Sequence, residues 1–116
     1  MTSKSCAICH DHVITGSRYV VPGLLARRLG QIIRYADYFK IGITGDLKAR
    51  AYSHGRDGWT KLTVVYESSS RANVRHVERE LVDRFSSRFP DKTWHACGGG
   101  GGPNHDGPKQ FVYIIT

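Results

Sequence analysis

Hydrophobic residues recur along this chain at spacings typical of both helices and strands. Helical spacing over about residues 22–36 predicts a first amphipathic helix, and a similar pattern predicts a long helix over about residues 70–89 that begins at a serine cap. Between them, Asp46 caps a short helix that runs to about His54, and we expect Gly55 to end it. Three helices are therefore predicted.

Three further segments alternate apolar and polar residues or are rich in β-branched residues, as strands are. They cover residues 38–44, 59–67 and 110–116. The last of them is strongly apolar, so we expect it to be paired inside a sheet rather than frayed. The order of elements predicts an α/β (α+β) fold, with a small three-stranded, mostly antiparallel sheet flanked by helices.

A glycine-rich stretch precedes the last strand. Five consecutive glycines, Gly98 to Gly102, are followed by two prolines within six residues. Glycine's backbone entropy and proline's missing N–H donor both oppose regular structure, so residues 96–109 are expected to form a long loop. We interpret residues 1–116 as one domain with an N-terminal extension over residues 1–21.

The composition narrows the possible classes of protein. Lys and Arg number 17 against 10 Asp and Glu, which gives a net charge of +7 on 116 residues. No apolar run approaches the ~20 residues of a bilayer span, and no signal peptide opens the chain, so we expect a cytoplasmic protein without a membrane partner. Three cysteines do not suit a disulfide scaffold. The charge favours a polyanionic partner, most often nucleic acid.

One carboxylate lies in an unusual position on the long helix. A helical wheel groups the apolar residues into one stripe and brings Glu78 inside that stripe, whereas Glu80 falls outside it. A carboxylate on a core-facing stripe is costly unless it is paired or binds a cation. Glu78 is therefore a candidate metal ligand. The alternative is a structural carboxylate at the edge of the stripe, which either extends toward solvent or pairs with Arg75 or Arg79.

The short helix carries an arginine and a histidine on one face. Arg50 and His54 are four residues apart, so one can contact a phosphate while the other accepts or donates a proton. Just before this helix, Tyr38, Lys40 and Gly42 share one face of the predicted strand. Gly42 would allow the following helix or a ligand to approach closely. The alternative is that Arg50 and His54 are ordinary surface residues.

These residues together resemble a known family. The stretch from Phe39 to Arg50, with His54 four residues on, is similar to the second half of the GIY-YIG nuclease signature, in which a strand ending in Gly leads to a helix with an essential Arg. The segment Val77–Val82 resembles the later helix that carries the family's metal-binding Glu. The resemblance assigns that role to Glu78.

The chain departs from that family at two points. Lys40 stands where the family's second Tyr usually lies, and no strand like the family's first one precedes Gly42 closely. The segment 111–115 resembles the missing strand, which makes Tyr113 the family's first Tyr in a circularly permuted domain. The competing interpretation puts the first strand at residues 18–21, followed by an inserted helix.

The resemblance implies a metal-dependent endonuclease that hydrolyses DNA, of the kind found in phages or mobile elements. Glu78 would hold one Mg²⁺ or Mn²⁺, Arg50 would stabilise the phosphate's charge, and Tyr113 with Lys40 or His54 would deprotonate the attacking water. Further contacts to nucleic acid are expected from four residues: Lys48, Arg56, Asn104 and Tyr38. Asn104, or His95, would supply the family's late polar group.

Two other classes of function stay open. The first is a nucleic-acid-binding module without catalysis. If the protein is a nuclease, RNA is an alternative substrate to DNA. The second is a zinc-binding interaction protein, because Cys6 and Cys9 have a C-x₂-C spacing and His95 and Cys97 could complete a tetrahedral Zn²⁺ site. Unpaired thiols are the simpler interpretation of the cysteines, since the second pair of ligands has no recognised spacing.

Overall fold

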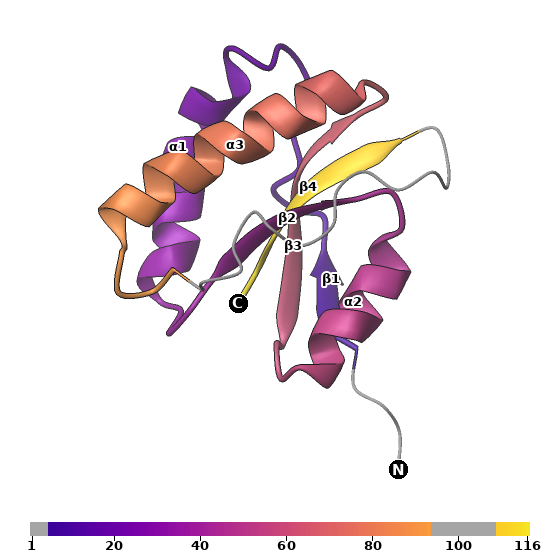
Figure 1. Cartoon of the computed structure of the whole chain (residues 1–116), viewed down its shortest axis with the longest axis vertical. Helices are drawn as coiled ribbons and strands as arrows, with labels where there is room; N and C mark the ends of the chain where they lie inside the picture. Colours follow the sequence, from indigo (N-terminus) through magenta and orange to yellow (C-terminus); the bar gives the residue numbers. More distant parts are fainter. Residues whose placement is uncertain (1–4, 94–108) are drawn as a thin grey trace.

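Helices and strands of the predicted kinds make up the computed structural model, which describes residues 5–93 and 109–116 (Figure 1). The elements are β1 (Ala7–Cys9), α1 (Val21–Arg34), β2 (Lys40–Thr44), α2 (Leu47–Arg56), β3 (Lys61–Ser68), α3 (Arg71–Arg88) and β4 (Gln110–Ile115). This confirms the α+β class. In the described part of the chain, no helix is long and apolar enough to cross a membrane.

The sheet contains four strands among the described residues, in the order β1-β3-β4-β2, so the prediction of three strands is wrong. The missed strand, β1, has three residues and is too short to show a clear alternation of apolar and polar positions. It pairs in parallel with the start of β3, and the Ala7 N–H donates to the Thr60 carbonyl at 2.9 Å. The other two pairings are antiparallel, as expected.

The last strand in the chain lies inside the sheet. β4 pairs with β2 on one side and with β3 on the other, and the register opposes Tyr113 to Gly42 and to Val64. The prediction of a paired, buried C-terminal strand is thus confirmed. The competing first strand at residues 18–21 is wrong, because residues 18–20 form a turn and Val21 begins α1.

The two faces of the sheet are covered by different helices. α1 and α3 pack together on one face, and α2 lies on the other (Figure 1). Successive residues of β4 alternate accordingly: Val112 and Ile114 join the core under α1 and α3, whereas Tyr113 and Ile115 join the core that includes Ala51 of α2. The sheet therefore separates two apolar cores, and Tyr113 belongs to the α2 side.

Side-chain caps begin two of the helices as predicted. The Asp46 carboxylate accepts a hydrogen bond from the Ala49 N–H at 3.1 Å, and the Ser70 hydroxyl accepts one from the Asn73 N–H at 3.2 Å. Gly55 does not end α2, which continues to Arg56. The residue with the left-handed backbone is Gly58, at φ +98°, because the chain reverses there to enter β3.

Candidate functional site

A buried hydrogen bond joins α2 to the middle of the sheet. His54 Nε2 lies 2.8 Å from the Tyr113 hydroxyl oxygen, and the two residues are only 6% and 1% exposed. Which group donates depends on the tautomer of His54. A buried polar group without a partner is costly, so each side chain satisfies the other and both are held in a fixed geometry.

Gly42 makes room for this pair. A Cβ atom at residue 42 would lie 2.6 Å from the Tyr113 hydroxyl oxygen and 2.7 Å from its Cζ atom. Gly42 and Tyr113 are also register partners in neighbouring strands. A close approach at Gly42 was predicted and is present, but the group that approaches is the phenol ring of Tyr113 and not the following helix or a ligand.

Two positive charges act on His54. Lys40 lies on the same face of β2 as Gly42, and Arg50 lies one helical turn before His54 on α2; both are partly buried. Burial lowers the pKa of His54 below its ordinary value, and Lys40 and Arg50 lower it further, while Asp57 opposes them. Near neutral pH the imidazole is therefore uncharged and can accept a proton.

The tyrosine cluster is the name used below for these five residues: Lys40, Gly42, Arg50, His54 and Tyr113. Four of them were predicted as catalytic from the sequence, and the structure brings all five together on the α2 face of the sheet. The spacing of Arg50 and His54 on one helix face was visible in the sequence. Their contact with β4 depends on the order of the strands.

Glu78 lies on the opposite side of the sheet from the tyrosine cluster, on α3. The apolar stripe predicted for this helix is buried at Val74, Val77, Leu81 and Phe85. Glu78 was predicted inside this stripe, but it is only partly buried, as expected of a carboxylate at the edge of the stripe. Among the described residues Glu78 forms no hydrogen bond or ion pair, so the predicted alternative of pairing with Arg75 or Arg79 is not seen. Burial raises the pKa of Glu78, and the charges of these two arginines partly offset the increase.

The described residues contain no group of three or more His, Cys, Asp or Glu side chains that could hold a metal ion. A single carboxylate nevertheless fits a particular kind of site. Mg²⁺ keeps several waters and often binds through one or two carboxylates together with substrate phosphates. Glu78, partly buried and without an ion pair in the described part of the chain, suits a cation site that the substrate completes.

The two N-terminal cysteines have different environments. Cys6 is buried, and its thiol donates to the Trp59 carbonyl at 3.3 Å. Burial raises the pKa of this thiol, which disfavours the thiolate that zinc requires. Cys9 lies on β1, opposite Thr63 of β3. His95 and Cys97 lie outside the described residues, so the zinc site stays a prediction.

The residues predicted to contact nucleic acid lie at the surface where they are described. Lys48 and Arg56 are exposed on α2, and the Arg56 guanidinium lies 6.0 Å from the centre of the Tyr52 ring. Tyr38 is 51% exposed and comes two residues before Lys40. Asn104 lies outside the described residues.

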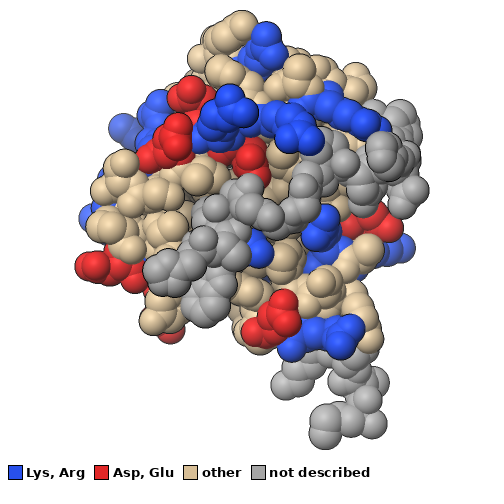
Figure 2. Space-filling view, viewed as in Figure 1, with Lys and Arg blue, Asp and Glu red and all other residues tan. Residues whose placement is uncertain are grey.

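The outward face of α3 carries a row of arginines that was not predicted from the sequence. Exposed arginines follow it at intervals of four or five residues: Arg71, Arg75, Arg79, Arg84 and Arg88. Figure 2 shows Lys and Arg side chains gathered over this helix, interrupted by acidic side chains. The spacing places the first three arginines on one helix face, so the pattern was available in the sequence.

The sequence of this chain matches the model of one known protein family. A family model, the T5orf172 domain, matches residues 25–102, which is more than half of the chain. The match includes Lys40, Arg50, His54 and Glu78, whereas Tyr113 lies beyond it. No curated protein and no solved structure matches the chain. The chain thus belongs to the T5orf172 domain family, a domain found in nuclease-like proteins of phages and mobile elements.

Proposed function

We propose that this protein is a metal-dependent endonuclease that hydrolyses phosphodiester bonds in DNA by a one-metal mechanism of the GIY-YIG type. The observation that carries the proposal is the buried 2.8 Å contact between His54 and Tyr113, beside the charges of Lys40 and Arg50. Membership of the T5orf172 family supports it independently. A domain that only binds nucleic acid would not need a neutral, buried imidazole–phenol pair beside these cations.

The imidazole–phenol pair supplies the path for the proton. The attacking water gives its proton to the Tyr113 oxygen as the phenol's own proton moves to His54 Nε2, which the lowered pKa of His54 keeps free to accept it. The Lys40 ammonium, whose charge acts on the same His54, stabilises negative charge that develops on the Tyr113 oxygen during this transfer. Tyr113 is 1% exposed, so the step requires that its oxygen be uncovered when substrate is bound.

Arg50 and Lys40 bind the phosphate. Both are partly buried, so their charges are less screened than those of fully exposed side chains. The planar guanidinium of Arg50 matches two phosphate oxygens and stabilises the additional negative charge that develops on them in the transition state. Phosphate binding explains why two cations lie near a histidine whose protonation they disfavour.

Glu78 would hold the metal ion, whose charge stabilises the leaving 3′ oxygen. Among the described strands, β2 lies at the edge of the sheet. α2 follows it on one face of the sheet, and α3 packs against it on the other. We therefore infer that the scissile phosphate lies along the β2 edge, where groups from both helices can reach it. The half-buried Glu78, without an ion pair in the described chain, supports this assignment.

The permuted chain order is part of the proposal. β4 lies antiparallel beside β2 with Tyr113 opposite Gly42, which is the arrangement expected if the family's first strand follows rather than precedes the rest of the domain. Antiparallel neighbours can exchange their order in the chain when the ends to be joined lie close together.

A cleavage assay on matched variants tests the function. Purified protein is incubated with labelled single- and double-stranded DNA and RNA, with Mg²⁺, Mn²⁺ or EDTA. We expect metal-dependent cleavage of DNA, lost by about a hundredfold or more in Glu78→Gln. Glu80→Gln, on the exposed side of the same helix, is the control and should cleave as the wild type does.

The alternatives give different results. Salt-dependent binding without cleavage of any substrate would contradict the enzyme and favour a binding module. Cleavage of RNA in place of DNA would change the substrate class. Full activity in Glu78→Gln would leave the enzyme intact but make the metal assignment wrong.

A further inference from the structure

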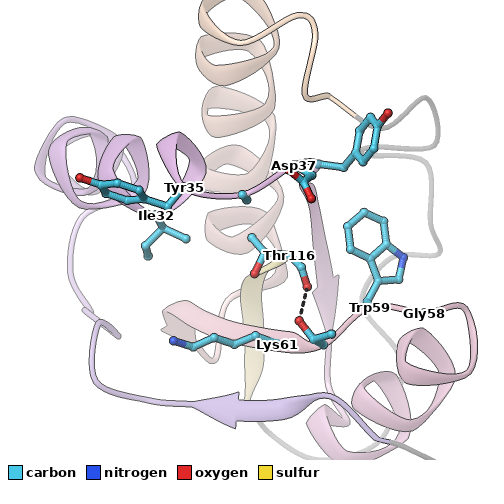
Figure 3. Close-up of a pocket in the computed structure, with 10 residues that line it drawn as sticks. Ile32, Tyr35, Asp37, Gly58, Trp59, Lys61 and Thr116 are labelled. Atoms are coloured by element: carbon cyan, nitrogen blue, oxygen red, sulfur yellow. Dashed lines mark hydrogen bonds between the residues drawn. The ribbon is translucent and has the colours of Figure 1, made fainter.

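Two adjoining cavities lie next to the tyrosine cluster, at the end of the sheet where β4 finishes. The larger, about 560 Å³, is lined by residues from the end of α1, from the segments that lead into β2 and β3, and by Lys61 and Thr116 (Figure 3). The smaller, about 490 Å³, includes Lys40 of the tyrosine cluster. Tyr38, Gly58 and Trp59 line both. Each volume falls in the range of about 300–1,000 Å³ that is typical of small-ligand sites.

Trp59 is fixed at the junction of the two cavities. Its backbone N–H donates to the His54 carbonyl at 3.2 Å, and its carbonyl accepts the Cys6 thiol at 3.3 Å. The turn at Gly58, with φ +98°, leads the chain from α2 into this position. The backbone of Trp59 is therefore held next to the backbone of His54, the proposed proton acceptor.

The lining combines aromatic rings with lysines. In the larger cavity Trp59 stands at one end, and Tyr35 and Lys61 stand at the other (Figure 3). Tyr35 is 85% exposed and Tyr38 is 51% exposed, so both present ring surface to solvent. Lys40 and Lys61 add positive charge on either side of Trp59.

This chemistry matches an unpaired nucleotide. Bases stack on aromatic side chains whatever their identity, and lysines follow the phosphates between them. The carboxylates of Asp37 and Asp57, which also line the cavities, repel phosphate but can accept hydrogen bonds from base amino groups. In a duplex, neighbouring base pairs cover the faces of each base, so only an unpaired base can enter.

We propose that these two cavities form a stacking site for an unpaired nucleotide beside the scissile phosphate, so that the protein acts on single-stranded nucleic acid or on unpaired bases within a duplex. The proposal takes the position of the phosphate, at Lys40 and Arg50, from the proposed function. Trp59 and Tyr38 provide the stacking surfaces, and Lys61 binds the next phosphate along the strand.

The test measures binding in EDTA, where no cleavage occurs. The probes are a fluorescein-labelled single-stranded DNA oligonucleotide, the same strand in a duplex, and a set of single strands that each lack one base. We expect Trp59→Ala to weaken single-strand binding by about 5- to 150-fold and to change duplex binding little. Trp59→Phe should retain most of the affinity.

Two further variants keep the test informative if Trp59→Ala unfolds. Tyr38→Ala, at an exposed position, should also weaken single-strand binding selectively. Tyr19→Ala is the matched control, because Tyr19 is 72% exposed and lines neither cavity. At one position of the strand, removal of the base should weaken binding to the wild type as much as the substitution does. Removal of the same base should weaken binding to the tryptophan or tyrosine variant no further.

The outcomes separate this inference from the proposed function. The stacking site would be overturned if the variants lost equal affinity for the single strand and the duplex. It would also be overturned if removal of no single base changed the affinity, even if the protein cleaves DNA. A position-specific base effect that Trp59→Ala or Tyr38→Ala removes supports the stacking site, even if no substrate is cleaved and the proposed function fails.

Discussion

The two faces of the sheet use the same strands for opposite purposes. Under α1 and α3, the inward residues of β2 and β4, such as Ile41, Ile43 and Val112, are apolar and pack against the two helices. Under α2, the alternate positions of the same strands hold Gly42 and Tyr113, and a buried hydrogen bond is built into a smaller apolar core that includes Ala51. One face supplies stability and the other supplies a defined polar geometry.

This division follows from the two-residue period of a strand. Lys40 and Gly42 alternate with Ile41 and Ile43, so a slip of one residue in the register would exchange the faces. The apolar face fixes the register strongly because its residues must be buried. The tyrosine cluster thus depends on packing that lies on the far side of the sheet.

The largest expected difference between the faces, in stability and in cleavage, comes from removing side-chain atoms at one residue on each face. Leu81→Ala, on α3, should lower the free energy of unfolding by about 2–5 kcal/mol, because it leaves a cavity in a fully buried core. Tyr113→Phe should cost less, about 1–3 kcal/mol, for the unpartnered His54. It should nevertheless reduce cleavage by about a hundredfold or more. Denaturant unfolding and cleavage rates per folded molecule measure both.

The reverse pattern would break the comparison. If Leu81→Ala lost cleavage per folded molecule while Tyr113→Phe retained it, the catalytic groups would not lie on the α2 face. Equal effects of both variants on stability and cleavage would mean that the two cores act as one.

Alanine substitutions at two glycines should change the free energy of unfolding by smaller amounts and in opposite directions. Gly42→Ala brings a methyl group against the Tyr113 ring and should destabilise by about 1–3 kcal/mol, with loss of cleavage. Gly30→Ala, on α1, meets only the end of the Arg88 side chain at 3.3 Å, which can move. It should stabilise by up to about 1 kcal/mol, since alanine favours the helix. Thermal unfolding of both variants is the measurement, and destabilisation by Gly30→Ala of the same size would contradict the distinction.

The smallest expected effect is a dependence of stability on pH. The pKa of His54 is lower in the folded protein than its ordinary value of 6.5, so the unfolded chain binds more protons below that value. The stabilising contribution of neutral His54 is therefore complete above pH 6.5 and decreases as the pH falls toward the lowered pKa. His54→Gln should show a weaker decline over this range in denaturant titrations. An unchanged pH dependence in His54→Gln would mean that another group titrates.

The sequence predicted those features that depend on local spacing. The Asp46 and Ser70 caps, the apolar stripe of α3 and the shared face of Arg50 and His54 each involve residues within a few positions of one another. The helix end at Gly55 was wrong because either of two glycines could reverse the chain, and Gly58 has the left-handed backbone.

The contacts that build the candidate site join residues that are far apart in the sequence. The hydrogen bond between His54 and Tyr113 joins residues 59 positions apart, and it exists because β4 inserts between β2 and β3. Hydropathy assigns Tyr113 to a strand but cannot choose its neighbours. The resemblance to a nuclease family suggested the neighbour, and the pairing of Gly42 with Tyr113 agrees with it. The short strand β1 left no detectable period at all.

The central position of β4 also sets an order for folding. β2 and β3 have no hydrogen bonds to each other in the sheet and meet only through the strand over residues 110–115. Until that segment has left the ribosome, both strands present unpaired edges, and α1 and α3 have an incomplete surface to pack against. Such pairings between distant segments are slow to form. The hydroxyl of Tyr113 reaches His54 only once β4 has paired, so under the proposed mechanism the proton path forms only when the sheet is complete.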